Sequence, residues 1–572
     1  MNRTFAPLEA LVDELARCGM RHAVASPGSR NAPLLLTLAA ERRIETHSVL
    51  DERSAGYVAL GLARATGRPV AVTCTSGTAA ANLMPAVVEA SEGRVPLVVL
   101  TADRPPELRD VGAGQSIDQV KLYGSAVKWF VEVGSHEPTR GTAIHHRALA
   151  CRAFHTAGGG RPGPVHLNFP LREPLSPEPD EHGRHHELWA GRADGRPWVD
   201  RREPPLDPDP ADLQKLAERI ANVPRGAIIA GATGEHDIAE PAARLAAATG
   251  WPLLAEPTSG LRCGPHDRSH VVAHYDVLLR SETFAERHRP ELVLRLGDTP
   301  TSKPLREWLA SARQVVIDPH AAWHEPTRAA ETIVGASPSR TCAGLADALR
   351  PGAPHRDADW TTAWRRADAL VPEALAEAPD PFEPKAYAAL PDSLPNGATV
   401  FVSSSMPIRY AETFFPQVST RLHFLANRGA NGIDGVVSTA AGAALAGGGQ
   451  PCVLLIGELA LLHDLSGLVA ARHLGAPLTV VCANNGGGGI FDFLPVAKTA
   501  DPAAYERLIA TPREVDLAQV SALGGLRHLT ARTPDEVRTA VGQPALVELP
   551  LDRTTAVERH RAVLARVEAG LS

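Results

Sequence analysis

Residues 452–489 read CVLLIGELALLHDLSGLVAARHLGAPLTVVCANNGGGG, and this stretch decides the fold class. Two short apolar runs, CVLLIG and PLTVVCA, flank one helical stretch, which predicts two parallel strands joined by a crossover helix. The first run ends at Gly457 and is followed by Glu458, and the second ends at Asn484-Asn485 before four glycines. Because the carboxyl ends of parallel strands meet at one edge of a sheet, where ligands bind, we expect Glu458 and Asn485 to lie close together.

The residue types at this predicted edge suit a diphosphate and a hard divalent cation. A carboxylate and an amide oxygen can share one Mg²⁺, whose other positions go to phosphate oxygens and water. The glycines allow backbone groups to approach a diphosphate closely. Either Gly457-Glu458 or Asn484-Asn485 alone is more simply interpreted as part of a Gly-rich turn after a buried strand. The predicted site therefore depends on the two segments together.

The alternation of strands and helices continues through the whole chain and predicts parallel α/β sheets covered on both faces. Two stretches interrupt it, residues 173–210 and 351–384, which are rich in Pro and charged residues and are predicted to connect domains. The fold class predicted is therefore three doubly wound α/β domains, at residues 1–175, 205–350 and 385–572. The histidines at positions 182, 185 and 186 in the first connection are expected to lie on a solvated loop rather than in a metal site.

Composition excludes several classes of protein. Lys and Arg total 58 against 65 Asp and Glu, so a formal net charge of -7 leaves no global basic field for nucleic acid. The seven Cys are scattered without a C-x-x-C pair, which favours reduced thiols in a cytoplasmic enzyme. No apolar run is long enough to span a membrane, and VVSTAAGAALAGGG is expected to form a close-packed buried helix, so no integral membrane contact is predicted.

The Gly-acid pair followed at a distance by Asn-Asn resembles the Gly-Asp…Asn-Asn signature of thiamine-diphosphate-dependent enzymes. That family has Asp where this chain has Glu458. The extra methylene moves the carboxylate by about 1.5 Å, and Mg²⁺ tolerates misplaced ligands poorly. A changed metal preference and a decayed metal site are therefore both open alternatives.

Glu52 is the second residue that the resemblance singles out. It follows the run ETHSVL and Asp51 and precedes a helical stretch. In thiamine-diphosphate enzymes a Glu in this place bonds the pyrimidine ring nitrogen and relays protons on the cofactor. Taken alone, Glu52 is more simply a helix-start carboxylate favoured by the helix dipole. In that superfamily the pyrimidine-binding domain of one subunit faces the diphosphate-binding domain of another, which implies a homodimer or homotetramer with active sites between subunits.

Further motifs make the resemblance more specific. Together they are similar to the 2-succinyl-5-enolpyruvyl-6-hydroxy-3-cyclohexene-1-carboxylate synthases of menaquinone biosynthesis, the MenD family. The motifs are ASPGSRNAPL (25–34), DERSAGYVALGLA (51–63), TSGTAAANLMPAVVEA (75–90), LTADRPPELRDVGAGQSIDQ (100–119), TSKPL (301–305), SSSMPIR (403–409), NRGANGIDG (427–435), GELALLHDLSGL (457–468) and NNGGGGIFDFLP (484–495).

The resemblance implies an activity and a set of site residues. The family decarboxylates 2-oxoglutarate and adds the resulting four-carbon unit to isochorismate, using thiamine diphosphate with Mg²⁺ or Mn²⁺. Both substrates are anionic, and arginine can grip a carboxylate with two parallel hydrogen bonds. The candidate catalytic residues are Glu52, Ser29, Arg30, Arg104, Gln115, Lys303, Ser405, Arg409 and Arg428. The candidate cofactor-binding residues are Glu52, Ser405, Ile433, Gly457, Glu458, Asn485, Gly487, Ile490, Phe491 and Leu494, of which Glu458, Asn485 and Gly487 are the candidate metal ligands.

Alternative functions remain open at this point. An acetolactate synthase type of enzyme would use pyruvate, whose single carboxylate needs fewer cations than this chain offers. A thiamine-diphosphate-binding protein with a decayed metal site is the non-catalytic alternative. The central domain is expected to be Rossmann-like, but Gly231-x-x-Gly234 is not the full G-x-G-x-x-G pattern, so no bound nucleotide is predicted.

Overall fold

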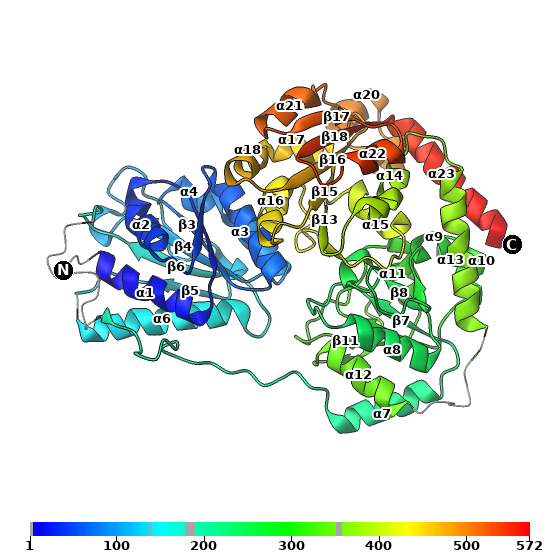
Figure 1. The fold of residues 1–572 in the computed structure, drawn as a ribbon, viewed down its shortest axis with the longest axis horizontal. Helices are drawn as coiled ribbons and strands as arrows, with labels where there is room; N and C mark the ends of the chain where they lie inside the picture. Colours follow the sequence, from blue (N-terminus) through cyan, green and yellow to red (C-terminus); the bar gives the residue numbers. More distant parts are fainter. Residues whose placement is uncertain (1–3, 138, 178–188, 350–356, 358, 572) are drawn as a thin grey trace.

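A computed structural model of the chain describes residues 4–137, 139–177, 189–349, 357 and 359–571. The described chain forms three α/β units, each built on a six-stranded sheet whose paired strands all run parallel (Figure 1). The prediction of three doubly wound α/β domains with parallel sheets is confirmed. The histidines at positions 182, 185 and 186 lie outside the described residues.

The first unit has the strand order β2-β1-β3-β4-β6-β5. Its strands are β1 (His22–Ala25), β2 (Glu45–Ser48), β3 (Val70–Cys74), β4 (Leu97–Asp103), β5 (Trp129–Glu132) and β6 (Val165–Pro170). Its helices are α1 (Phe5–Cys18), α2 (Ala32–Ala40), α3 (Glu52–Thr66), α4 (Thr78–Asn82), α5 (Met84–Glu92) and α6 (Arg140–Gly158). Alternate residues of β4 enter different cores, with Val98 and Leu100 packing beneath α1 and α6, and Leu97 and Val99 beneath α3 and α5. Both faces of the sheet are therefore covered.

The middle unit has the order β12-β11-β10-β7-β8-β9, which is the strand order of dinucleotide-binding Rossmann folds. Its strands are β7 (Gly226–Ala230), β8 (Leu253–Ala255), β9 (Val271–Val272), β10 (Leu292–Leu296), β11 (Gln314–Ile317) and β12 (Ala330–Val334). Its helices are α7 (Pro210–Ala221), α8 (Ala239–Thr249), α9 (Tyr275–Leu278), α10 (Glu282–Arg287), α11 (Lys303–Leu309) and α12 (Pro338–Ala348).

The third unit, with the order β14-β13-β15-β16-β18-β17, repeats the strand order of the first. Its strands are β13 (Ala398–Val402), β14 (Leu422–Leu425), β15 (Cys452–Gly457), β16 (Leu478–Asn484), β17 (Arg527–Thr530) and β18 (Ala545–Pro550). Its helices are α14 (Glu383–Ala389), α15 (Met406–Phe414), α16 (Val436–Ala446), α17 (Glu458–His463), α18 (Leu465–Leu474), α19 (Val496–Thr499), α20 (Pro502–Tyr505), α21 (Leu517–Leu523), α22 (Pro534–Ala540) and α23 (Arg553–Leu571). The region 452–489 thus has the predicted strand, helical segment and parallel strand.

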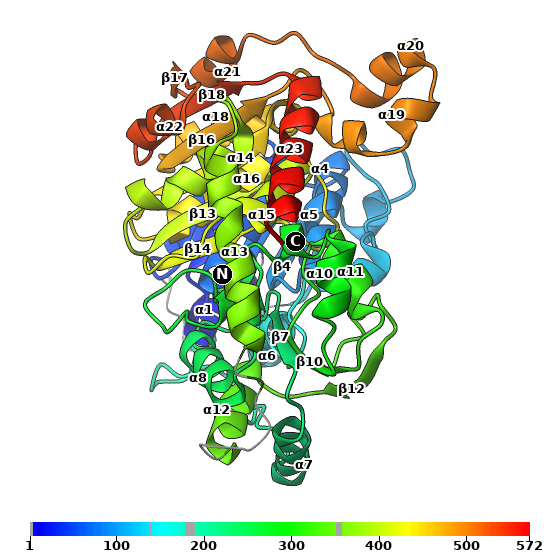
Figure 2. The ribbon, with the colours of Figure 1, turned by 90° about the vertical axis from the view of Figure 1, so that its right-hand side faces the viewer.

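The helix α13 (Trp360–Ala376) joins the middle and third units and lies beside α23 (Figure 2). Trp360 and Trp364 belong to one continuous apolar core that contains residues of both units. The connection between the first and middle units is instead an extended segment, which Arg147 holds by donating a hydrogen bond of 2.6 Å to the carbonyl of Trp189 (Figure 1).

The helix α16 crosses α3 at two glycines, and this contact joins the third unit to the first. A Cβ at Gly442 would lie 2.1 Å from the carbonyl oxygen of Val58, and one at Gly61 would lie 2.0 Å from that of Thr439. Only glycine allows the two backbones to approach this closely. The predicted close-packed buried helix at residues 436–446 is confirmed. Within the described residues, no helix combines the length and the apolar character that a membrane crossing requires.

One local prediction is wrong. The run after Gly457 is expected to be a single helix, but it divides at Asp464 into α17 and α18. Asp464 is buried, and its carboxylate accepts the backbone N–H of Ser438 at 2.7 Å and the Ser438 hydroxyl at 2.9 Å. This tertiary contact holds Asp464 at φ -129° and ψ 46°, outside the helical region.

Candidate active site

The carboxyl ends of three neighbouring strands in the third sheet, β13, β15 and β16, meet at one edge. Glu458 follows β15 and is buried, and its two carboxylate oxygens face the loop after β16. One oxygen accepts the N–H of Gly487 at 2.6 Å, and the other lies 3.5 Å from the N–H of Asn485. The predicted proximity of Glu458 and Asn485 is confirmed.

Burial raises the pKa of Glu458, and the backbone N–H groups of Gly487 and Asn485 lower it only in part. The charged carboxylate is therefore costly to hold in this environment without a cation. A divalent cation at this position would stabilise the ionised form, so the electrostatics of Glu458 fit a metal ligand.

Three further polar atoms at the same edge are buried without a hydrogen-bond partner among the described residues. They are Asn485 Oδ1 and the hydroxyl oxygens of Ser403 and Ser404, which follow β13. Buried polar groups normally find partners, so unsatisfied groups gathered at a ligand edge indicate a bound polar group. Their chemistry, an amide oxygen beside hydroxyl donors, fits a metal-bound diphosphate. The sequence motifs predict Ser405 as a site residue but not Ser403 or Ser404, although a run of three serines after a strand is a usable signal.

The loop that carries Gly487 has a backbone conformation that requires glycine. Gly487 has φ +144°, and a Cβ there would lie 2.7 Å from the carbonyl oxygen of Ala510. The apolar residues that follow are not core: Ile490 is half-buried, and the side chains of Phe491 and Leu494 are exposed. Both therefore present an apolar surface to the outside of this chain beside the Gly-rich loop.

Ser405 and Arg409 lie at the start of α15, at the same edge. Ser405 has φ +72°, which is strained for a residue with a side chain, and its carbonyl accepts a hydrogen bond of 2.6 Å from Arg409. Arg428 follows β14 and makes no hydrogen bond or ion pair with another described residue. Desolvation, and then the positive charges of Arg428 and Arg306, lower the pKa of Arg409. These arginines therefore form a cationic cluster to which the middle unit adds Arg306, a residue that the sequence analysis did not name.

A second pair of predicted cations lies in the first unit. Arg30 is buried at the end of β1, and burial followed by the charge of Arg104 lowers its pKa. Arg104 donates hydrogen bonds to the Ser76 hydroxyl at 3.2 Å and to the carbonyl of Gly114 at 3.1 Å. The side chains of Ser29 and Gln115 are exposed. The structure thus places Arg30 and Arg104, two of the predicted cations, within reach of each other's charge.

Glu52 is the first residue of α3, but it does not cap the helix. Asp51 does so by accepting the N–H groups of Arg53 at 2.9 Å and Ser54 at 3.3 Å. Glu52 itself is half-buried, and its carboxylate makes no hydrogen bond or ion pair with any described residue. Glu52 stands in the first turn, where the helix dipole favours a carboxylate as predicted, and Asp51 is the residue that caps the helix, so the Glu52 carboxylate is left available for a ligand.

The start of α3 lies against the third unit of the same chain at the junction of α17 and α18. Arg53 donates a hydrogen bond of 3.0 Å to the carbonyl of His463, and the hydroxyls of Ser54 and Ser466 lie 2.8 Å apart. No hydrogen bond among the described residues joins Glu52 to Ile433, which is half-buried, or to the loop after β16. Within the described part of one chain, no hydrogen bond or ion pair links the Glu52 carboxylate to the residues predicted to hold the diphosphate.

Lys303 differs from these residues in its exposure to solvent. It begins α11, its side chain is 77% exposed, and its Nζ lies 3.4 Å from Glu307. Lys303 therefore offers a solvated charge rather than a buried one.

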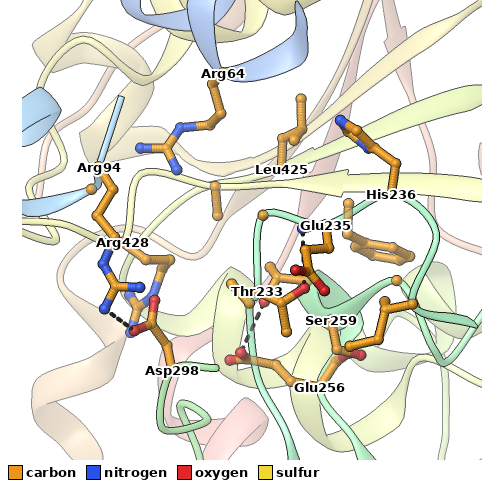
Figure 3. Close-up of a pocket in the computed structure, with 18 of the residues that line it drawn as sticks. Arg64, Arg94, Thr233, Glu235, His236, Glu256, Ser259, Asp298, Leu425 and Arg428 are labelled. Atoms are coloured by element: carbon orange, nitrogen blue, oxygen red, sulfur yellow. Dashed lines mark hydrogen bonds and ion pairs between the residues drawn. The ribbon is translucent and has the colours of Figure 1, made fainter. Parts of the chain in front are cut away.

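A cavity of about 1330 Å³ opens where the three units meet (Figure 3). The first unit lines it with Arg64 and Arg94, the middle unit with Glu256 and Asp298, and the third unit with Arg428. Arg94 pairs with Asp298 at 3.0 Å, and Arg64 with Glu89 at 3.2 Å, so both cations are already neutralised within the protein. Of the predicted site residues, only Arg428 lines this cavity, and neither Glu52 nor Glu458 does.

Comparisons with known proteins agree with this geometry. Residues 8–122 match the family described as thiamine pyrophosphate enzyme, N-terminal TPP binding domain. Residues 187–401 match the middle domain of thiamine pyrophosphate, and residues 409–549 match the C-terminal TPP binding domain. Relatives named 2-succinyl-5-enolpyruvyl-6-hydroxy-3-cyclohexene-1-carboxylate synthase extend over almost the whole chain. The one from Geobacillus thermodenitrificans is 43% identical over 98% of this chain and 95% of its own length, and the one from Myxococcus xanthus is 43% identical over 98% and 97%. The one from Chloroflexus aurantiacus is 42% identical over 98% of this chain and 96% of its own length.

The chain belongs to this synthase family. As a member of the family it is an enzyme of the transferase type that depends on thiamine diphosphate. The strand order shared by the first and third units fits this conclusion, because the two matched TPP binding domains are these two units.

Proposed function

We propose that this synthase decarboxylates 2-oxoglutarate and adds the remaining four-carbon unit to isochorismate, giving 2-succinyl-5-enolpyruvyl-6-hydroxy-3-cyclohexene-1-carboxylate for menaquinone biosynthesis. The observation that carries the proposal is the near full-length identity to synthases of that name, combined with two clusters of arginines beside a polar edge that suits a diphosphate.

Glu458, Asn485 and Gly487 are proposed to hold Mg²⁺ or Mn²⁺, with Ser403, Ser404 and Gly457 lining the diphosphate. The unpartnered amide oxygen of Asn485 and the raised pKa of Glu458 support this assignment. The ion anchors the diphosphate and does not act on the reacting carbonyl. Thiamine diphosphate, when bound, accepts the electron pair that loss of carbon dioxide leaves behind.

The chain's own residues hold the substrates and move protons. Glu52, whose carboxylate has no partner within the described chain, is proposed to hold and relay a proton at the pyrimidine nitrogen of the cofactor. Ser405 and Ile433 are proposed to fix the cofactor from the side of the third unit, while Ile490, Phe491 and Leu494 exclude water from it.

The carboxylates of both substrates are proposed to bind the cations. Arg409 and Arg428 lie within reach of each other's charge, as do Arg30 and Arg104, so each pair can take one dianion. Ser29 and Gln115 act as neutral donors beside the first pair, and Lys303 reaches the site only as a solvated charge.

The assembly is proposed to be a homodimer or homotetramer with active sites between subunits. Within one chain Arg53 and Ser54, which follow Glu52, contact the α17–α18 junction of the third unit, while Phe491 and Leu494 are exposed. Pairing of the first unit of one subunit with the third unit of another would cover these apolar side chains and complete each site.

Turnover of 2-oxoglutarate with isochorismate, followed by carbon dioxide release and product mass, tests the proposal. Turnover of pyruvate alone would instead favour an acetolactate synthase type of enzyme. Calorimetry with thiamine diphosphate and Mg²⁺ or Mn²⁺ on the wild type and on Glu458→Asp tests the non-catalytic alternative. Metal-dependent binding that appears only in the Asp variant would indicate a decayed metal site.

A further inference from the structure

Three potential metal ligands converge on the outer strand of the first sheet, away from the candidate active site. They are His22 on β1 and Glu45 and His47 on β2. The parallel register pairs His22 with Glu45, and His47 follows Glu45 by two residues, so the three side chains lie on the same face of the sheet. His47 is buried, His22 is half-buried and Glu45 is exposed, which leaves the group open to solvent on one side.

The distances match a tetrahedral site for a zinc-class ion. His22 Nδ1 and His47 Nε2 are 3.3 Å apart. Two nitrogen ligands at the usual zinc distance and the tetrahedral angle would be about 3.3–3.4 Å apart. The Glu45 carboxylate oxygens lie 3.6 Å from His22 Nδ1 and 4.0 Å from His47 Nε2, so a small rotation of an exposed side chain completes a third ligand.

The electrostatic surroundings also suit a cation. Burial, as the largest cause, lowers the pKa of both His22 and His47, which favours the neutral imidazole, the form that binds metals. The other charged neighbours that shift these pKa values are Glu45 and, for His47, His22 itself. Among the described residues, no Arg or Lys pairs with the Glu45 carboxylate.

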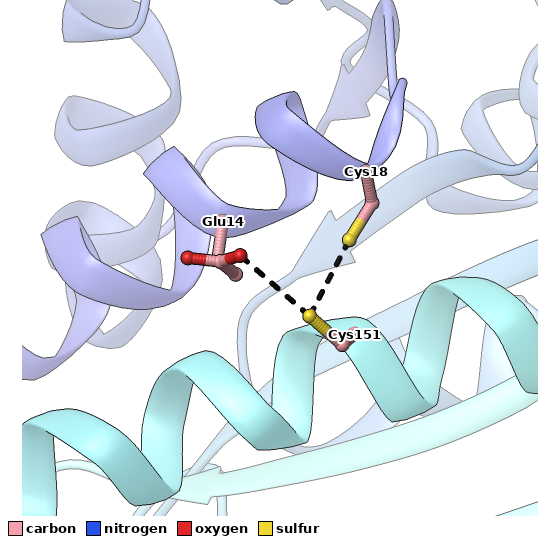
Figure 4. Close-up of side chains that lie close together, drawn as sticks. All are labelled: Glu14, Cys18 and Cys151. Atoms are coloured by element: carbon pink, nitrogen blue, oxygen red, sulfur yellow. Dashed lines mark hydrogen bonds between the residues drawn. The ribbon is translucent and has the colours of Figure 1, made fainter. Parts of the chain in front are cut away.

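A second group of potential ligands, Glu14, Cys18 and Cys151, offers a contrast (Figure 4). The two sulfurs are 3.6 Å apart, but Arg147 donates a hydrogen bond of 2.7 Å to the Glu14 carboxylate. The backbone N–H groups of Trp198 and Val199 donate to Glu14 and Cys151. These ligand atoms are therefore already occupied by donors and by a cation, so this group does not indicate a metal site.

We propose that His22, Glu45 and His47 form a binding site for a divalent transition metal of the zinc class, with one coordination position open to water. Two imidazole nitrogens and a carboxylate are a ligand set that Zn²⁺ favours over Mg²⁺. The bound metal cross-links the outer strand β2 to β1. Because β2 ends at Ser48 and Glu52 begins α3, the site lies on the segment that leads directly to the proposed proton relay.

Titration of the full-length protein with Zn²⁺, in saturating Mg²⁺ and thiamine diphosphate, tests the proposal. We expect one zinc ion to bind per chain at this site and to raise the melting temperature. Glu45→Gln and His22→Gln should weaken this binding at least about tenfold and abolish the zinc-dependent rise in melting temperature. Co²⁺ in the same site should give the intense visible absorption of a four-coordinate ion.

The variants separate loss of a ligand from loss of fold. Glu45 is exposed, so Glu45→Gln is expected to melt at the wild-type temperature without zinc, whereas substitution of the buried His47 would disturb the sheet. His473→Gln, on the exposed side of α18, is the matched control and should bind zinc as the wild type does. Unchanged zinc affinity and stoichiometry in both Glu45→Gln and His22→Gln would overturn the proposal, whether or not the proposed synthase reaction is observed.

Discussion

The crossing of α3 and α16 gives a sharp test of how the two cofactor-binding units are held together. A Cβ at Gly442 would lie 2.1 Å from the carbonyl oxygen of Val58, whereas ordinary contact begins at 3.4 Å. In Gly442→Ala the helices must therefore separate by about 1.3 Å, since the atoms of α3 that the new Cβ would meet belong to the backbone and cannot rotate away.

The size of the effect follows from this displacement. Overpacking of a close contact costs about 1–3 kcal/mol, so the free energy of unfolding is expected to fall by that amount. Glu52 begins α3, and the loop with Ile433 precedes α16, and each is proposed to belong to a site that another subunit completes. The same separation therefore misplaces what this chain contributes to both sites. A misplacement of about 1 Å can cost on the order of a hundredfold in rate, so kcat is expected to fall more than the stability loss alone would suggest.

Thermal melting and steady-state kinetics of Gly442→Ala measure both effects, and Gly141→Ala in α6 is the matched control. A Cβ at Gly141 meets only the Thr139 hydroxyl, at an ordinary 3.6 Å. Because alanine favours helix over glycine by up to about 1 kcal/mol, the control should melt at or above the wild-type temperature. If Gly442→Ala melts and turns over like Gly141→Ala, the inference that this crossing positions the site is refuted.

Four further variants test the site and the pH dependence of stability. Glu458→Gln keeps an acceptor for the Gly487 N–H but removes the negative charge. Metal-dependent binding of thiamine diphosphate, measured by calorimetry, should therefore weaken at least about tenfold. Without cofactor, the variant should melt no lower than the wild type, because the buried charge is gone. Arg428→Gln should raise the KM of an anionic substrate by roughly 10–150-fold, the loss of a charged hydrogen bond, whereas Lys303→Gln should have a smaller effect because that side chain is 77% exposed. Burial raises the pKa of Glu383 to about 7 from an ordinary 4.5. As pH rises from 4.5 to 7, this carboxyl group loses its proton in the unfolded chain before it does so in the folded chain. The free energy of unfolding therefore falls over this range, by up to about 3 kcal/mol. Glu383→Gln, which can still accept the Tyr387 hydroxyl, should therefore melt higher than the wild type at pH 7 and lose that part of the pH dependence.

Each of these predictions has an outcome that contradicts it. Unchanged metal-dependent binding in Glu458→Gln would remove Glu458 from the metal site. A larger KM effect in Lys303→Gln than in Arg428→Gln would make the solvated charge the principal anchor. Parallel pH profiles for Glu383→Gln and the wild type, recorded by melting between pH 4.5 and pH 7, would mean that Glu383 titrates normally.

The two strands named from the sequence, CVLLIG and PLTVVCA, are present as β15 and β16, and both lie inside their sheet. The outermost strands of the three sheets, β2, β5, β9, β12, β14 and β17, carry a weaker apolar pattern. An outer strand buries fewer side chains, so its apolar pattern is diluted: β2 reads Glu-Thr-His-Ser and β17 Arg-His-Leu-Thr. These outer strands form by pairing with a strand that is distant in the sequence, and a local sequence pattern carries no information about that partner.

Some features of the candidate site can likewise be predicted from the sequence, and others cannot. The positions of Glu458 and Asn485 at strand ends could be predicted, because a parallel sheet brings such ends to one edge whatever the details of packing. The charged groups around Arg428 could not be predicted, since Glu256 and Arg306 approach it from another unit. Nor could the roles of Asp51 and Glu52 be separated, because either carboxylate can cap a helix and only the folded backbone shows that Asp51 does so.

The amino-acid sequence by itself determined the fold class, the family resemblance and the edge of the sheet where a diphosphate would bind, because alternating apolar runs and residues at strand ends are local features. Only the tertiary structure decided which charges remain unpaired. Whether a side chain is neutralised depends on residues far away in the chain, as with Arg94 and Asp298, which pair across two units, and Arg428, which does not pair at all with a described residue. The same holds for His22, Glu45 and His47, because the register of two parallel strands, and not their spacing along the chain, brings the three ligands together.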